Sequence, residues 1–185
     1  MKNKKLSLQG LTDERILSLK AGDNLLLSGV LYTARDAAHK RMCEDFEKGK
    51  GFPFDIKGQA IYYAGPCPAK PGEIIGSCGP TTSGRMDAYS PILLDNGLKI
   101  MIGKGGRNSA VKDAVVRNKC LYLGAAGGCG ALIADSIKKA EVIAYPDLGT
   151  EAIRQLLVED FPCTVLLDAF GNDFYETAQK PYEKC

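Results

Sequence analysis

The run Gly79-Pro80-Thr81-Thr82-Ser83-Gly84-Arg85-Met86-Asp87 places three hydroxyl side chains and an arginine between and beside two glycines, directly after an apolar segment. This pattern predicts a strand, a tight turn and the start of a helix. Glycine lets the backbone approach a ligand closely, and the free N–H groups at the start of a helix favour negative charge. We therefore expect this run to bind an anion; the alternative is an ordinary turn with a surface arginine.

The same run nearly matches the phosphate-binding loop of nucleotide hydrolases. That motif requires a lysine where Arg85 stands, and a serine or threonine that holds magnesium where Met86 stands. Both positions differ here. A carboxylate ligand fits this run better than a nucleotide phosphate, because a guanidinium binds a carboxylate through two parallel hydrogen bonds.

Apolar runs alternate with helical patterns on both sides of this stretch. The expected strands are residues 5–9, 24–33, 60–64, 73–78, 98–102, 120–123, 141–144 and 164–167. The expected helices are residues 12–22, 36–48, 86–96 with a restart at Ser90-Pro91, 109–116 and 150–157. This alternation predicts an α/β fold with parallel strands. We expect residues 1–185 to form a single domain, because a chain of this length can bury a core large enough to fold alone.

Composition narrows the class of ligand and the compartment. The net charge is +2, and basic residues do not alternate with aromatic ones, so we expect no nucleic acid partner. We expect no membrane partner, since no window approaches the ~18 apolar residues of a membrane span and the basic first five residues precede no signal-length apolar core. Seven cysteines without a C-x-x-C pair favour reduced thiols and a cytoplasmic location. These cysteines are residues 43, 67, 78, 120, 129, 163 and 185.

Three cationic side chains follow expected strands: Arg35, Arg85 and Lys104. If these strand ends lie along one edge of the sheet, the three charges converge on one ligand. A small dicarboxylate fits that arrangement, with a cation for each carboxylate. Taken singly, Arg35 could instead pair with Asp36, and Lys104 could be a solvated loop residue.

Other reactive residues give weaker signals. His39 is the single histidine, and we expect it to be solvated on a polar helix face. Cys67, Cys78, Cys120 and Cys129 are interpreted as small apolar residues, with a nucleophilic pair of Cys67 or Cys129 with His39 as the alternative. The sequence contains no Cys/His cluster at metal-ligand spacing, so we expect no metal bound by this chain itself.

A set of short blocks carries a resemblance to a known family. In chain order they are residues 33–40, 63–68, 79–87, 103–105, 122–124, 145–153, and 158–162 continuing to 171–174. They resemble the β subunit of class I iron–sulfur hydro-lyases, the fumarate hydratase and L-tartrate dehydratase group, which is equivalent to the C-terminal domain of class I fumarase. Two departures are visible: Gly105-Gly106 follows Lys104 where Gly-Asn is common, and residues 127–130 replace a Gly-Gly-Pro type of turn.

The resemblance implies a swivelling three-layer β/β/α domain with a mixed, partly parallel central sheet. It implies an active site shared with an α subunit, which holds a [4Fe-4S] cluster on three cysteines, in a hetero-oligomer of α and β chains. Arg35, Arg85 and Lys104 match the family's carboxylate-binding cations. Thr81 matches the proton-transfer residue, and Thr82 and Ser83 would add hydroxyl contacts to the substrate.

These inferences lead to one functional hypothesis and two alternatives. The hypothesis is the β subunit of a fumarate hydratase, a hydro-lyase that interconverts fumarate and (S)-malate and is inactive without its α subunit. The first alternative is an L(+)-tartrate dehydratase β subunit, which would bind its substrate through the same carboxylate-binding residues. The second is a carboxylate-binding or assembly module without catalytic duty, which a neighbouring reading frame lacking three cluster-ligand cysteines would favour.

Overall fold

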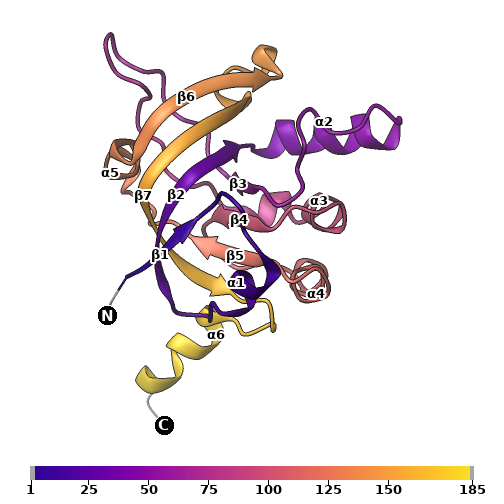
Figure 1. Ribbon diagram of the computed structural model, residues 1–185, viewed down its shortest axis with the longest axis vertical. Helices are drawn as coiled ribbons and strands as arrows, with labels where there is room; N and C mark the ends of the chain where they lie inside the picture. The colour runs from indigo at the N-terminus through magenta and orange to yellow at the C-terminus, as the bar shows by residue number, and fades with distance from the viewer. Residues whose placement is uncertain (1–2, 184–185) are drawn as a thin grey trace.

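The computed structural model describes residues 3–183, and the predicted thiol at Cys185 lies outside them. Within this range the strands form one mixed sheet in the order β1-β2-β3-β4-β5-β7-β6 (Figure 1). The first five strands pair in parallel, whereas β7 runs antiparallel to β5 and β6. The strands are β1 (Lys4–Ser7), β2 (Asn24–Thr33), β3 (Ala60–Tyr62), β4 (Ile100–Gly103), β5 (Leu121–Gly124), β6 (Ile137–Ala144) and β7 (Ile153–Leu167).

The long strand β7 closes the sheet on itself. It pairs antiparallel with β2 from Asn24 opposite Thr164 to Thr33 opposite Arg154, while its last residues pair with β5. Since β2 also connects to β5 through β3 and β4, these five strands form a closed ring. Gly29 lies at the register shift in β2 with φ +125°, a conformation that residues with a side chain rarely adopt.

The helices are short and join the strands. They are α1 (Asp13–Leu17), α2 (Asp36–Glu47), α3 (Ser90–Asp95), α4 (Ser109–Arg117), α5 (Gly130–Asp135) and α6 (Phe174–Ala178), with 3-10 helices η1 (Ser83–Met86), η2 (Pro146–Glu151) and η3 (Lys180–Tyr182). Thr12 caps α1 as expected, because its hydroxyl accepts from Arg15 N. Pro91 lies in the first turn of α3, where its missing N–H costs nothing. No helix of the described part is long and apolar enough to span a membrane.

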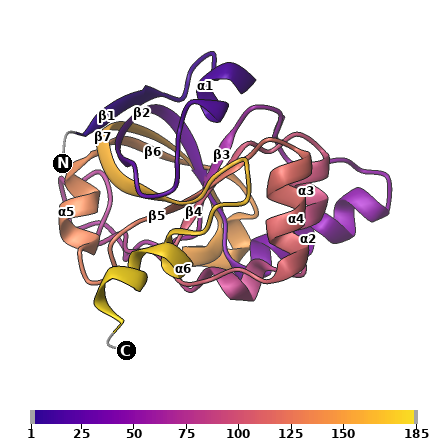
Figure 2. The ribbon, with the colours of Figure 1, turned by 90° about the horizontal axis from the view of Figure 1, so that it is seen from below.

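Two apolar clusters define the layers. One lies inside the closed sheet and includes Leu27, Ile102 and Phe161. The other fills the space between the sheet and α2, α3 and α4, and includes Met42 and Leu93. Figure 2 shows these three helices together on one side of the strands. The expected α/β fold with a mixed, partly parallel central sheet is confirmed.

Two expected elements are wrong. Residues 150–157 do not form a helix: Thr150 belongs to η2, and Ile153 begins β7. This segment bonds on one side to β2 and on the other to β6, so strand pairing overrides its local helical spacing. Residues 73–78 do not form a strand either. They lie in an irregular segment in which Gly76 approaches the carbonyls of Cys67 and Pro68 so closely that a Cβ would lie 2.6 Å from both oxygens.

Candidate functional site

The predicted site residues lie on loops that follow parallel strands. Arg35 comes after β2, Lys104 comes after β4, and the run 79–87 crosses between them. Near its start, this run forms an isolated β-bridge between Pro80 and Ala64, which lies just beyond β3. Thr82 then forms a second bridge with Lys104. The carboxyl ends of parallel strands meet at one edge of a sheet, so the three segments converge there.

Arg35 and Arg85 share one carboxylate. Arg85 Nε lies 3.3 Å from Asp36 Oδ1, and Arg35 Nε lies 3.6 Å from Asp36 Oδ2. Arg35 is also 3.8 Å from Glu151, whose second oxygen accepts from Ala37 N at the start of α2. The two arginines therefore lie around one carboxylate, which is the pairing of Arg35 with Asp36 that stood as the alternative. Their binding of one ligand together with Lys104 stays a prediction.

Thr81 lies directly beside Arg85. Arg85 Nη2 donates to Thr81 Oγ1, and the backbone of Thr81 is held by a 2.7 Å bond from its N to Tyr63 O. A guanidinium bonded to a hydroxyl oxygen stabilises negative charge on that oxygen. Thr81, the predicted proton-transfer residue, thus contacts the cation of Arg85, which is four residues later in the chain.

Lys104 is linked to the run 79–87 through its backbone. Its carbonyl accepts from Ser83 N at 2.9 Å, and its exposed side chain lies against Gly127, where a Cβ would be 3.6 Å from Nζ. Thr82 beside it is exposed, and the substrate contact expected of it stays a prediction. Gly105 follows at φ +84°, and this left-handed turn is one that glycine favours.

Ser83 differs from its neighbours because its side chain is buried. Its Oγ lies 2.9 Å from the hydroxyl oxygen of Tyr122, which in turn is 2.7 Å from Gly105 O. A carbonyl can only accept, so Tyr122 donates to Gly105 O and accepts from Ser83. The substrate contact predicted for Ser83 stays a prediction, and Tyr122 is its partner in this structure.

His39 is buried, and the expectation that it is solvated is wrong. It lies on the face of α2 that packs against the sheet, with its ring 5.1 Å from that of Tyr63 and 6.4 Å from that of Tyr89. Its Nδ1 donates to Arg35 O at 2.9 Å. Burial lowers the pKa of His39 to about 4, so the imidazole is neutral near pH 7. These neighbours give His39 a structural position behind Arg35 rather than a place beside Cys67 or Cys129.

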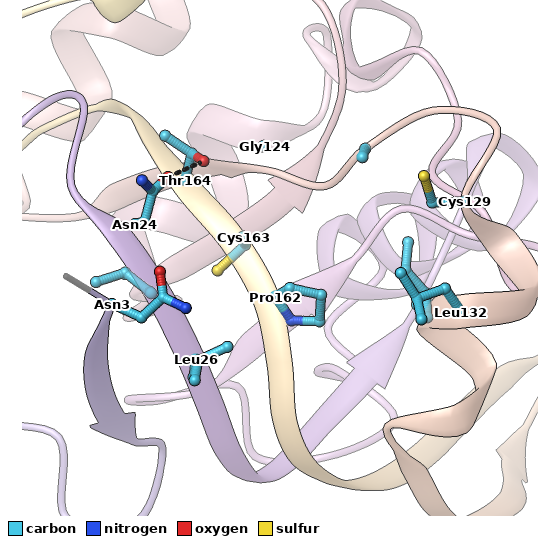
Figure 3. A pocket seen from close by; sticks show the side chains of 12 residues that line it. Asn3, Asn24, Leu26, Gly124, Cys129, Leu132, Pro162, Cys163 and Thr164 are labelled. Carbon is cyan, nitrogen blue, oxygen red and sulfur yellow. Dashed lines mark hydrogen bonds between the residues drawn. The ribbon is translucent and has the colours of Figure 1, made fainter. Parts of the chain in front are cut away.

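A pocket on another part of the molecule contains none of the predicted site residues. It has a volume of about 260 Å³ and lies between β2, β7 and the segment that leads into α5 (Figure 3). Leu26, Leu132 and Pro162 contribute apolar walls, and Thr164 Oγ1 donates to Asn24 Oδ1 at 2.8 Å. The candidate site is therefore on the loops that carry Arg35, Arg85 and Lys104, because none of these residues lines the pocket.

Comparison with known proteins identifies the family. A family model described as "Fumarase C-terminus" matches residues 1–178. The chain belongs to the fumarase C-terminal family. Among its relatives, "Fumarate hydratase class I, aerobic" of Salmonella typhimurium is 45% identical over 84% of this chain, and "Fumarate hydratase 2" of Leishmania major is 40% identical over 88%.

This fumarase C-terminal chain is much shorter than those two relatives, of which it covers 27% and 29%. A relative of matching length exists in Methanocaldococcus jannaschii. That protein carries the provisional name L(+)-tartrate dehydratase subunit beta, and it is 38% identical over 94% of this chain and 93% of its own length. The match confirms the family resemblance drawn from the sequence blocks.

Four of the six described thiols of this fumarase C-terminal chain lie in surroundings that favour the protonated form. Burial raises the pKa of Cys43 to about 11 and the pKa values of Cys78 and Cys120 to about 12, and it also raises that of Cys163. Metal ligation requires thiolates. In residues 3–183 no group of three or more Cys, His, Asp or Glu side chains could hold a metal ion. Cys78 and Cys120 are buried, which fits their interpretation as small apolar residues, whereas Cys129 is half-buried and Cys67 is exposed.

Sequence reasoning missed the residues that lie behind the site. Asp36 was considered only as a partner of Arg35, although it also pairs with Arg85. Tyr122 and Glu151 lie within blocks that carry the family resemblance, residues 122–124 and 145–153, but no role was assigned to either, and Arg107 lies outside these blocks. For Arg107 one signal existed, since it follows Lys104 by three residues in the same glycine-rich loop.

Proposed function

We propose that this chain is the β subunit of a heteromeric hydro-lyase that interconverts fumarate and (S)-malate. The observation that carries the proposal is the group of Arg35, Asp36, Arg85 and Thr81. The two oxygens of Asp36 face the two guanidinium groups at 3.3 and 3.6 Å, which is how a carboxylate sits between these cations. Beside them a hydroxyl accepts from Arg85, so carboxylate binding and proton transfer are available at one place.

The reaction requires several functional groups, and this chain can supply some of them but not all. Adding water across a double bond between two carboxylates requires cations that bind the carboxylates, a group that moves a proton, and an acid that polarises the departing hydroxide. Arg35, Arg85 and Lys104 supply the cations. Thr81 takes the proton-transfer role, with Arg85 stabilising negative charge on its oxygen. A threonine hydroxyl is a poor base by itself, so the proposal requires a charged neighbour from another chain.

The acid is proposed to be a [4Fe-4S] cluster on the α subunit, as the family resemblance implies. The described residues of this chain do not fit such a cluster, because the buried cysteines favour the protonated form and are not grouped. The proposed assembly is therefore a hetero-oligomer of α and β chains, with one small dicarboxylate bound between them. We also propose a cytoplasmic location, supported by the free thiols of the six described cysteines.

A second candidate is the dehydration of L(+)-tartrate. The observation that favours it is the Methanocaldococcus relative, which has the length of a separate subunit and a name from that activity. The anion-binding residues serve either substrate, since both are dicarboxylates. The same relative supports the division of the enzyme into two chains.

Reconstitution with the cognate α chain under anaerobic conditions tests the proposal. We expect the two-chain complex to hydrate fumarate and to dehydrate (S)-malate, and we expect each chain alone to be inactive. Preference for tartrate over malate would select the second candidate. Turnover of fumarate by the β chain alone at enzymic rates, or a complex inactive on both substrates, would overturn the shared-site hydro-lyase.

A further inference from the structure

A buried charged residue lies beneath the two loops of the candidate site. Arg107 is 8% exposed, although its guanidinium stays charged at any pH at which the protein folds. Its Nε donates to Asp87 Oδ1 at 2.6 Å and its Nη2 donates to Ser90 Oγ at 2.7 Å. The guanidinium also lies 5.4 Å from the ring centre of Tyr63 and 4.9 Å from that of Tyr122.

The partners of Arg107 connect two segments. Asp87 immediately follows η1 and is two residues after Arg85, whereas Arg107 is three residues after Lys104. The second oxygen of Asp87 accepts from Asn108 N at 2.8 Å, where Asn108 caps α4. The carboxylate thus holds the end of one site loop against the end of the other.

Tyr122 makes the corresponding connection at the opposite end of η1. It rises from β5, donates to Gly105 O and accepts from Ser83. The Ser83 N to Lys104 O bond lies beside it. Gly103 permits this approach, because a Cβ there would overlap Ser83 Oγ.

The buried hydrogen bonds of Arg107 and Tyr122 are not explained by the stability of the core alone. Burying an ion pair costs several kcal/mol per ion in desolvation, and replacing such a pair with apolar side chains is often neutral or stabilising. Apolar side chains would not supply directional bonds to two different loops. The bonds of Arg107 and Tyr122 all end on residues 83–90 or on residues 101–105, the segments that carry Arg85 and Lys104.

We propose that Arg107 and Tyr122 are positioning residues, which touch no substrate and fix Thr81 and Arg85 relative to Lys104. The inference rests on the proposed function, and it adds residues that set the geometry of the site from below. A displacement of about 1 Å at a catalytic group can cost roughly 100-fold in rate. Loosening either connection is therefore expected to slow turnover much more than it weakens the fold.

The test compares Tyr122→Phe and Arg107→Lys with wild type in the reconstituted two-chain enzyme. Phenylalanine removes both hydroxyl bonds and keeps the ring, while lysine keeps the charge and cannot reach Asp87 and Ser90 with a planar fork. Tyr32→Phe is the matched control, since it removes a buried tyrosine hydroxyl that accepts from Gln155, away from both loops. We expect kcat to fall by about 10- to 100-fold in the two variants, with KM changed less than threefold and the control unchanged.

Hydrogen exchange gives a readout that does not depend on turnover. The amide of Ser83, bonded to Lys104 O, is expected to exchange at least about tenfold faster in Tyr122→Phe, while amides of β4 and β5 keep their protection. Unchanged exchange at Ser83, or a kcat within twofold of the Tyr32→Phe control, would overturn the positioning role. An inactive wild-type complex would instead refute the proposed function, and the exchange comparison would still decide whether the loops are held in this way.

Discussion

Replacing Arg85 with alanine separates the role of this residue in the site from its role in the fold. The side chain is 48% exposed and pairs with Asp36 at 3.3 Å. An exposed pair of this kind contributes about 0–1 kcal/mol to folding. Arg35 remains beside Asp36 in the variant, so the carboxylate keeps a cationic partner. For a chain of this size, that loss corresponds to a shift in Tm of at most about 4 °C.

The catalytic loss is expected to be far larger. Arg85 both donates to Thr81 and presents a cation at the carboxylate position, and removing one such donor from a preorganised site costs about 100- to 1000-fold, or roughly 2.7–4 kcal/mol. We therefore expect kcat/KM for malate to fall by that factor in the Arg85→Ala complex. The measurements are steady-state kinetics of the reconstituted enzyme and thermal unfolding of the isolated chain.

Arg117→Ala is the matched control. Arg117 is 49% exposed and forms a two-pronged pair with Asp95 on the surface, away from the site. This variant is expected to show a similarly small change in Tm and unchanged kinetics. A kcat/KM for Arg85→Ala within tenfold of wild type, or equal losses in both variants, would refute the reasoning.

Three further predictions concern the fold and its titrating groups. Gly103→Ala is expected to destabilise the chain by about 1–3 kcal/mol in urea unfolding, because its Cβ would overlap Ser83 Oγ, whereas Gly106→Ala, with open space around it, should change stability far less. The pKa of His39 is lowered from 6.5 to about 4, so its contribution to stability is complete above pH 6.5 and is lost as pH falls toward 4. In urea unfolding, the free energy of unfolding of wild type should fall between pH 6.5 and 4, and a His39→Gln variant with the same pH dependence would contradict this assignment. Native protein should react with a thiol reagent at the exposed Cys67 much faster than at the buried Cys78 and Cys120, and equal rates measured by peptide mass spectrometry would refute the assigned burial.

Local sequence patterns predicted the elements that depend on neighbouring residues. Thr12 and Pro91 mark helix starts through their own chemistry, and both positions are confirmed. The apolar runs that become β2, β4 and β5 are bounded by glycines and polar residues, so their existence was visible without the structure. Arg35 was placed by its position after a strand that exists, β2, whereas the strand expected before Arg85 is absent and the run 79–87 reaches the site through its bridges to Ala64 and Lys104.

Interactions between distant segments explain the errors. Residues 153–157 have a helical spacing of apolar side chains, but they are held between β2 and β6, which no local pattern reveals. His39 sits among charged residues in the sequence, yet it lies on the same face of α2 as the buried Met42 and Cys43, which packs against the sheet. The network of Arg107 and Tyr122 likewise joins residues that only the closed sheet brings together.

The pairing of β2 with β7 has a consequence for the order of folding. Asn24 bonds across to Thr164, so one of the earliest strands is completed by one of the last. Contacts so far apart in the sequence form slowly, because a long loop must close before they contribute stability. During synthesis the edge of β2 that faces β7 therefore stays unpaired until the last strand has emerged, even though β1 and β3 can already pair with its other edge.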